Sequence, residues 1–436
     1  MIRGLKRGWR RRAAEAFVLG VVSLTSACAT YSTGFQATEA ALMRHQPRVA
    51  LQVLEKQRPP KRDMVLYLLN KAMLLRMNGD YTASNQAFEA AKRLTSELSA
   101  VSLREQSESF VINDATRSYV GEEYELVLVH LYEALNYLNL GQLDDARVEA
   151  VQVDLELQAY HERFSKAGYT QDAFARYLNG MIYEDLGEIS DAMIAYRKAY
   201  EAYQGYQIHY GVAVPAPLKR DLLRLSRAMG LDDELRRYQQ AFGLDLQAAQ
   251  RDPDKGEVVF ILSNGLVPIK RQASTLVPTY NSGRLIRISL PVYQYRTSGA
   301  DYARVNVDGQ RADTAVMENV AAIAIQNLKE KMPAITARAI ARAVVKAKLA
   351  DEADKNGDPL LGLMVNIAGI ATEVADTRSW LTLPDNIQMA RLAVAPGTYT
   401  VKVDLYGNYG RVLKEQAFSD VVVKQGRMTF LTYAWI

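Results

Sequence analysis

Apolar and polar positions follow the spacing of α-helices through the first half of the chain. Between Gly34 and Ala248, apolar residues recur three or four positions apart, and strand signals are few. A block repeats in this region: a helical stretch, a Gly followed by acidic or polar residues, and a second helical stretch with small residues inside it. This pattern predicts helical hairpins, with copies at 78–88, 140–150 and 186–196 and a weaker one at 229–238.

The third copy shows best how the two helices of a hairpin are expected to pack. Small residues let two antiparallel helices approach, tyrosines fill the space toward neighbouring helices, and a Gly at the turn ends the first helix. The candidate repeat-packing residues are Gly79, Gly141 and Gly187 at turns, Gly180, Ala192 and Ala199 at close approaches, and Tyr183 and Tyr196 in the gaps.

These blocks resemble tetratricopeptide (TPR) repeats, whose period is about 34 residues. Ala50 lies 34 residues before Ser84, so 47–57 is expected to form the second helix of an earlier, degenerate unit. The turn glycines are spaced irregularly, at 79, 141, 187 and 230, and 109–123 lacks a helical pattern and is expected to be an inserted loop.

A helical-repeat array suggests a binding role. Stacked helix pairs share one continuous core and curve into a surface that binds peptides or helices of other proteins. We expect protein partners on this surface. The alternative, which the sequence leaves open, is that the array only packs against the second half of the chain.

After a polar hinge at 251–256, the pattern changes to short strands. β-Branched and aromatic runs are separated by turn residues such as Asn264-Gly265 and Asp308-Gly309. About seven such strands favour a β-sandwich-like part. The expected strands are 257–263, 284–291, 303–307, 388–394, 398–405, 420–423 and 428–433.

A helical insert at 318–375 interrupts these strands. Two Ala-rich amphipathic helices are expected at 319–331 and 334–351, with Pro333 in the first turn of the second. The stretch 360–371 is the most apolar part of the chain after the leader, but it is short for a membrane span. We therefore expect a buried helix there in preference to a membrane-inserting one.

Basic and acidic residues are distributed unevenly along the chain. The 436 residues carry 53 basic and 49 acidic side chains, but 1–27 alone hold six basic residues and one acid. The remainder has 47 basic and 48 acidic residues, so the basicity does not indicate a nucleic-acid partner. An n-region of positive charge, an apolar stretch at 16–24 and small residues after it are typical of a secretory signal.

Cys28 is the only cysteine, and it lies directly after this leader. Ser26-Ala27-Cys28 resembles a bacterial lipobox, although Thr25 stands where Leu is usual. The resemblance implies removal of 1–27 and acylation of Cys28, with the acyl chains holding the protein at a bilayer. Ala29, rather than Asp, follows the cysteine, and this favours the periplasmic face of the outer membrane by the general sorting pattern of bacterial lipoproteins.

Candidate chemistry is sparse. The histidines are scattered and form no His-Glu-x-x-His zinc motif; His130 is expected to be a packed residue. The stretch 352–358 partly resembles a calcium loop but lacks its final Glu, and a polar loop explains it better. No nucleophile elbow, phosphate-binding Gly-rich loop or dinucleotide fingerprint is present. We expect no catalytic residues, no metal site and no cofactor.

Taken as a whole, the chain resembles uncharacterised bacterial envelope lipoproteins with a TPR-like N-terminal half. The stretches 132–141, 145–149, 256–259 and 266–270 carry this resemblance. Proteins of that group occur alongside lipoproteins that activate cell-wall synthases, which implies a role in envelope maintenance.

The predicted organisation is an α+β multidomain protein: a lipoprotein signal peptide at 1–27, a TPR-like array at 28–250 and a mixed domain at 256–436. The predicted function is a lipid-anchored scaffold or adaptor that binds protein partners in the periplasm. The alternative is a non-catalytic subunit of an envelope secretion or polysaccharide-export apparatus. Neither the partner nor the oligomeric state follows from the sequence.

Overall fold

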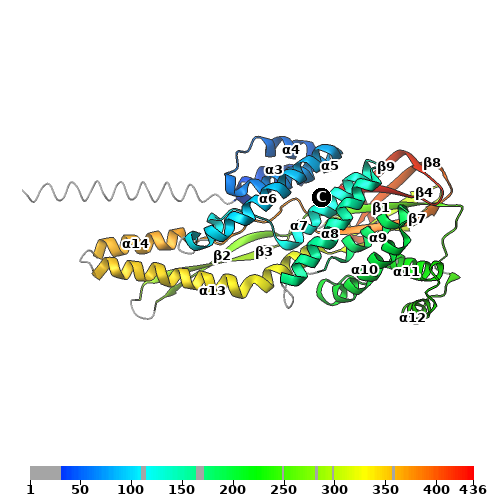
Figure 1. The fold of residues 1–436 in the computed structure, drawn as a ribbon. Helices are drawn as coiled ribbons and strands as arrows, with labels where there is room; N and C mark the ends of the chain where they lie inside the picture. Colours follow the sequence, from blue (N-terminus) through cyan, green and yellow to red (C-terminus); the bar gives the residue numbers. More distant parts are fainter. Residues whose placement is uncertain are drawn as a thin grey trace, which may run out of the picture.

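A computed structural model describes residues 31–109, 114–163, 171–247, 250–279, 283–296, 299–355 and 359–436. Cys28 and the predicted leader lie outside this part of the chain. The first half is helical, as expected, and forms an array that lies along one side of the molecule (Figure 1). Its helices are α2 (Tyr31–Gly34), α3 (Gln36–Leu42), α4 (Pro47–Glu55), α5 (Met64–Met77), α6 (Tyr81–Ser109), α7 (Glu123–Asn139), α8 (Leu143–Arg163), α9 (Ala173–Asp185), α10 (Ile189–Tyr210), α11 (Ala216–Ala228) and α12 (Asp232–Phe242).

These helices form successive hairpins, in which α3 packs on α4, α5 on α6, α7 on α8, α9 on α10 and α11 on α12. Each hairpin turns at one residue with positive φ: His45, Gly79, Gly141, Gly187 or Gly230. In all five, the next residue donates its backbone N–H to a carbonyl five positions earlier, which closes the preceding helix. The first repeat is therefore complete, but His45 takes the place of the turn Gly, 34 residues before Gly79.

The second half contains two four-stranded sheets and a separate two-stranded ribbon. The first sheet has the order β10-β1-β7-β6 and the second the order β5-β4-β8-β9, whereas β2 pairs only with β3. The strands are β1 (Gly256–Asn264), β2 (Ile269–Pro278), β3 (Leu285–Gln294), β4 (Tyr302–Val307), β5 (Gln310–Asp313), β6 (Ala315–Glu318), β7 (Asn386–Val394), β8 (Gly397–Gly407), β9 (Arg411–Val423) and β10 (Met428–Trp435).

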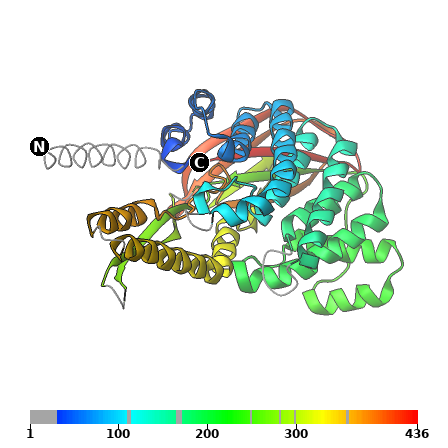
Figure 2. The ribbon, with the colours of Figure 1, turned by 60° about the vertical axis from the view of Figure 1, so that its left-hand side comes forward.

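The two four-stranded sheets pack face to face as a β-sandwich. Val258, Phe260 and Leu262 of β1 point into this core, where they meet Val403 and Leu405 of β8. All nine residues of β1 are buried, because its other face packs against the helical array. The molecule therefore has three layers: helices, the first sheet and the second sheet. Figure 2 shows strands of the second half behind the helices of the array.

Strand pairing differs from the local order of the chain. β9 and β10 follow each other across Gln425-Gly426 but belong to different sheets. β10 instead pairs in parallel with β1, from Glu257 opposite Met428 to Asn264 opposite Trp435. β2, β5 and β6 were not among the expected strands, and β9 is much longer than expected.

The helical insert forms a hairpin of α13 (Val320–Lys355) and α14 (Pro359–Thr372). The expectation of two helices separated at Pro333 is wrong, because α13 continues through it. A proline inside a helix forgoes one backbone hydrogen bond, but α13 has buried residues both before Pro333, at 320–328, and after it, at 339–350, which hold the helix in place. β3 packs against both α13 and α14.

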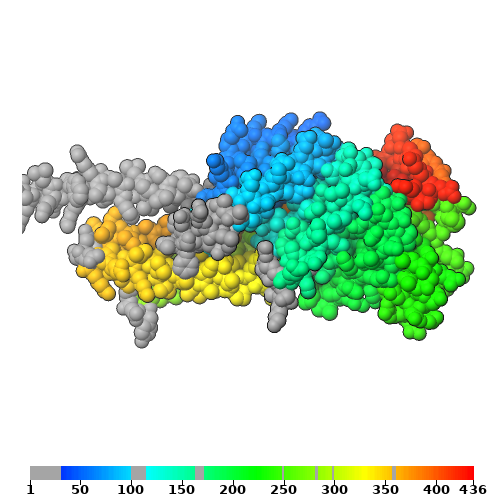
Figure 3. Space-filling model, in the orientation of Figure 1, coloured from blue at the N-terminus to red at the C-terminus, as the bar shows by residue number. Residues whose placement is uncertain are grey.

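The expectation that 360–371 is a buried helix is also wrong. α14 is exposed or half-exposed along nearly all of its length, since α13 and β3 cover only one side of it. We call β2, β3, the part of α13 from Arg338 onward and α14 "the arm". The arm projects beyond the body of the molecule (Figure 3). Among the described helices, none is both long and apolar enough to cross a membrane.

Candidate functional site

Six of the eight predicted repeat-packing residues lie in the hairpin of α9 and α10, and Gly79 and Gly141 lie at the turns of the α5–α6 and α7–α8 hairpins. A Cβ atom built on Gly180 would lie 2.2 Å from Cδ1 of Tyr196, so the Tyr196 ring occupies the space that any side chain at 180 would need. Ala192 and Ala199 are fully buried, and Tyr183 is nearly so. Gly180 therefore permits the close approach of the two helices, and Tyr196 fills the gap between them.

The inner face of the array is made by the first helix of each hairpin. All thirteen residues of α9 are buried, and thirteen of the seventeen in α7. The second helix of each hairpin covers one side of these helices. The other side shares one core with Val259 and Ile261 of β1, Met389 of β7 and Phe430 of β10. The first sheet thus occupies the surface on which a repeat array would be expected to hold a peptide.

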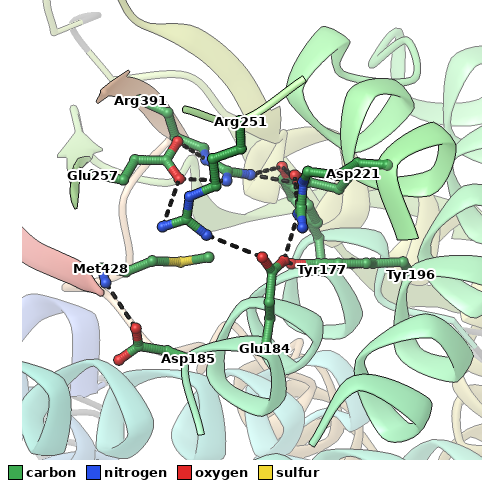
Figure 4. A network of polar contacts seen from close by, with 10 residues as sticks. Tyr177, Glu184, Asp185, Tyr196, Asp221, Arg251, Glu257, Arg391 and Met428 are labelled. Carbon is green, nitrogen blue, oxygen red and sulfur yellow. Dashed lines mark hydrogen bonds and ion pairs between the residues drawn. The ribbon is translucent and has the colours of Figure 1, made fainter. Parts of the chain in front are cut away.

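A buried polar network joins this inner face to the sheet (Figure 4). Arg391 of β7 donates two hydrogen bonds to Glu257 of β1, of 2.7 and 2.8 Å, and pairs with Asp221 of α11. The Tyr177 hydroxyl of α9 donates to Asp221 at 2.9 Å. Burial alone raises the pKa of Asp221, but Arg391 and Arg224 outweigh it and keep that pKa below its usual value. The carboxylate is therefore ionised and held by its partners.

The same network continues around Glu184 of α9. Glu184 accepts from the Tyr196 hydroxyl at 2.8 Å, from Arg224 at 2.8 Å and from Arg251 of the hinge at 3.0 Å. Asp185 accepts from the backbone N–H of Met428 at 2.7 Å, which places the end of α9 at the start of β10. Each of these acids has its partners, so the network fastens the two halves and presents no free acid or base.

A second set of contacts fastens the array near Trp380, which is fully buried. Its ring packs edge-on against Phe88 and Tyr132 of the array, and its backbone N–H donates to Glu125 at 2.8 Å. Burial and the nearby Glu122 carboxylate raise the pKa of Glu125. The two halves of the chain are thus joined at two separate places, one at α6 and α7 and one at α9 and α11.

Tyr196 was predicted as a packing residue, but none of the charged residues at these junctions was predicted from the sequence to join the two halves. The available signal was a charged residue inside an apolar run, such as Arg391 within β7 or Glu125 and Glu133 within α7. A charge in such a position needs a buried partner. The pattern does not say which one, because Asp221 and Arg391 lie 170 residues apart.

His130 is buried, and its neighbours form the one group of potential metal ligands found among the described residues. Atoms of His130, Glu133 and Glu149 lie within 4.8 Å of one another. His130 Nδ1 lies 2.6 Å from Glu149, however, and the Lys92 ammonium lies 2.7 Å from Glu133 and 3.5 Å from Glu149. Lys92 thus already supplies the positive charge that a cation would bring.

Burial and the Glu149 carboxylate raise the pKa of Glu133 to about 9. Burial also acts to raise the pKa of Glu149, but the hydrogen bond with His130 and the charge of Lys92 bring it below its usual value. The cluster is therefore a buried charge network whose protonation depends on pH.

The remaining candidates from the sequence do not converge on a site. His45 stacks on Trp435 at 4.1 Å between ring centroids, and His161 lies on α8. The stretch 352–358, expected to be a polar loop, is described only to Lys355 and up to there belongs to α13; Asp354 within it and the preceding Asp351 pair with Arg284. Nothing in the described chain gathers these residues around a common cavity.

The outer face of the array carries an exposed aliphatic stripe on α8. Val148, Val151 and Leu155 are 53, 37 and 54% exposed, and they lie near one face of the helix. Beside Val151 and Leu155 is a hollow of about 320 Å³ between α8, α9 and α10. At its edge Asp154 pairs with Arg176 at 2.7 Å and Lys198 at 3.1 Å. We call the stripe and the hollow "the outer groove"; its shape suits an apolar segment of another protein.

Comparison with known proteins gives limited similarity. Residues 61–218 match the family model described as cohesin loading factor, which covers α5 to α10 and the start of α11. This is a little over a third of the chain. No curated protein matches the sequence significantly.

Several solved structures match about half of the chain. MamA is 13% identical, with 49% of this chain and 91% of that chain covered and a TM-score of 0.31. A putative kinesin light chain from Podosopora anserina with nearly identical TPR-like repeats is 14% identical, with 50 and 94% covered and a TM-score of 0.31. BtubC (BKLC) from P. vanneervenii is 16% identical, with 56 and 89% covered and a TM-score of 0.31. Because these identities and TM-scores are low, the evidence for the fold is the hairpin geometry described above.

Proposed function

We propose that this protein is a non-catalytic scaffold or adaptor, lipid-anchored at the periplasmic face of the outer membrane, that binds a protein partner in cell-envelope maintenance. One observation carries the binding role. The inner face of the array is covered by the protein's own sheet, while the outer groove leaves Val148, Val151 and Leu155 exposed beside a hollow. The outer groove is therefore where we place the partner.

The paired acids at both junctions support a non-catalytic role. Arg391, Arg224 and Arg251 neutralise the acids of the first network, and Lys92 pairs with Glu133 of the His130 cluster. In the first network these side chains stabilise the fold rather than stand ready to transfer protons. The cell-envelope setting rests on the leader, the sole cysteine and the family resemblance in the sequence.

The anchor is tested by replacing Cys28 with Ser and measuring both palmitate labelling and membrane fractionation. We expect the wild-type chain to be labelled and to sediment with the outer membrane. The Cys28→Ser chain should lose the label, even if an uncleaved leader keeps it in a membrane. An unlabelled wild-type protein would contradict lipidation.

The binding role is tested with photo-crosslinkers placed in the full-length protein. A probe at Leu155 should give one discrete crosslinked product in cells, and Val148→Asp should abolish it. A probe at Ile208, which is 81% exposed but lies far along α10, is the control and should give no such product. An isolated array is unsuitable, because removing the sheet would expose its apolar inner face. Equal products at both probes would contradict the assignment of the outer groove.

A secretion or polysaccharide-export subunit is the second candidate, and the exposed apolar α14 favours it. In that case a probe on the arm, at Leu363, should crosslink to an integral membrane protein. A scaffold that acts through the outer groove predicts its protein crosslink at Leu155 instead.

A further inference from the structure

The arm carries the largest group of exposed aliphatic side chains outside the array. On α14, Leu360, Leu361, Leu363 and Ile367 are 57, 47, 51 and 47% exposed. The fourteen residues of α14 include no charged side chain. A helix of this composition is normally covered on all sides in a water-soluble domain.

The cause of this exposure is one-sided packing. A Cβ atom on Gly362 would fall against Asp354 and the backbone of Ala350, and one on Gly369 would lie 3.3 Å from Lys346. Both glycines thus bring α14 into close contact with α13. The leucines lie around the rest of the helix surface, where the described chain has no further layer to cover them.

Other parts of the arm add to the same apolar end. Leu276 at the end of β2, Leu285 at the start of β3 and Leu349 near the end of α13 are 50, 47 and 46% exposed. All three lie near a hairpin end of the arm, where β2 leads to β3 and α13 leads to α14. The apolar surface is therefore shared by the helices and the ribbon.

The arm is also basic. The sequences 271–287 and 338–372 together contain eight basic and four acidic residues, although the chain after Cys28 is nearly neutral. Arg284 and Lys346 pair with acids of the arm or its base, but Lys348 and Lys355 are exposed. An apolar end surrounded by excess positive charge matches the surface of a bilayer that contains anionic lipids.

The direction of the arm fits the proposed anchor. Figures 1 and 2 both show the arm projecting from the end of the molecule at which the described chain begins with α2 (dark blue). Tyr31 is the third residue after Cys28, so an acylated Cys28 would lie within about 10 Å of Tyr31. A bilayer that holds the acyl chains would then be close to the arm.

We propose that the arm binds the surface of an anionic lipid bilayer, with the leucines of α14 inserted among the acyl chains, as a second membrane contact of the anchored protein. This inference rests on the proposed function, because the anchor sets the orientation. α14 is about 21 Å long, too short for a hydrocarbon core of about 30 Å, so it lies in the interface and does not span it. The exposed lysines of α13, Lys348 and Lys355, contact lipid phosphates.

The test is vesicle flotation with the chain from Ala29, which contains every described residue and carries no acyl group. Vesicles of phosphatidylethanolamine with phosphatidylglycerol should bind it, and vesicles of phosphatidylcholine should bind it at least ten-fold more weakly. The triple variant Leu360→Ser, Leu361→Ser, Leu363→Ser should lose at least ten-fold in binding to the anionic vesicles. These residues are exposed, so its thermal melting curve should match that of the wild type.

The matched control changes exposed aliphatic residues outside both the arm and the outer groove: Ile194→Ser, Ile208→Ser and Val422→Ser, which are 46, 81 and 52% exposed in the wild type. This variant should bind vesicles like the wild type. Failure of the acyl-free wild type to float, or equal flotation of the two triple variants, would overturn the proposal. The proposal would also be overturned if light scattering showed that the wild type self-associates and that only the arm variant does not. In that case a second copy of the chain, and not a bilayer, would cover the apolar surface of the arm. The assay uses no acyl group, so its outcome is separate from that of Cys28→Ser.

Discussion

Replacing Gly180 with Ala is expected to destabilise the array, although the same change usually stabilises a helix. The added Cβ would lie 2.2 Å from Cδ1 of Tyr196, whereas carbon atoms in contact normally lie about 3.5–4.0 Å apart. The Tyr196 ring would have to move by more than about 1 Å. It has little freedom to do so, because it is fully buried, contacts Tyr177 and donates its hydroxyl hydrogen to Glu184 at 2.8 Å.

The magnitude follows from three terms. Overpacking a close-packed interior costs about 1–3 kcal/mol, and loss of the Tyr196 hydrogen bond would add about 1 kcal/mol. The higher helix propensity of Ala offsets about 1 kcal/mol of this loss. We therefore expect Gly180→Ala to lower the free energy of unfolding by about 1–3 kcal/mol.

Gly205→Ala is the matched control, since Gly205 also lies within a helix of the same hairpin. A Cβ atom built there meets nothing within 4 Å, so only the propensity term applies. This variant should gain about 0.5–1 kcal/mol. The two substitutions are thus expected to change the free energy of unfolding in opposite directions.

Native-state hydrogen exchange of the amides in α9 and α10 is the suitable measurement, because a chain of several layers need not unfold in one step. Gly180→Ala should speed exchange in both helices, and Gly205→Ala should slow it. If Gly180→Ala left exchange unchanged or slowed it, the close approach of α9 and α10 would not depend on this glycine.

Three further predictions concern the buried contacts. Arg391→Met should cost about 3 kcal/mol, because Asp221 and Glu257 lose the buried cation that they share and keep only Arg224 and Arg251; urea denaturation measures this. Trp380→Ala should cost about 3–5 kcal/mol, and tryptophan fluorescence should then lose the signal of a fully buried indole. The pKa of Glu133 is about 9 in the folded state and about 4.5 in the unfolded state, so the folded state binds this proton more tightly. The protonated Glu133 therefore stabilises the fold at low pH, and this stabilisation is lost as the pH rises from about 4.5 to 9. Glu133→Gln should therefore lose less stability than the wild type between pH 6 and 9 in thermal melts.

Each of the three has a contrary outcome. Urea curves for Arg391→Met that match those of an exposed control, Arg236→Gln, would show that the network does not hold the two halves together. A small cost for Trp380→Ala would mean that the junction around it tolerates a cavity. Parallel pH profiles for the wild type and Glu133→Gln would show that Lys92 keeps Glu133 ionised throughout.

Local pattern was sufficient for the repeat units. Helical spacing predicted the hairpins, and each turn needs a residue that adopts positive φ, so Gly79, Gly141 and Gly187 were recognisable in the sequence. The first repeat was harder to identify because His45 takes this conformation in place of a Gly. Most strands were also predicted, since their β-branched runs end at turn residues. β2 was not predicted, because most of its residues are exposed and its sequence does not alternate between apolar and polar residues.

The arrangement of these units was decided by contacts between distant parts of the chain. The sequence by itself determined that an array of helical hairpins precedes a set of short strands, because helix and strand periodicity depend on neighbouring residues. It did not determine that β1 pairs with β10, that Arg391 meets Asp221, or that the first sheet covers the inner face of the array. Those outcomes depend on which apolar faces and buried charges complement one another in three dimensions, and complementarity between surfaces leaves no local period in a sequence.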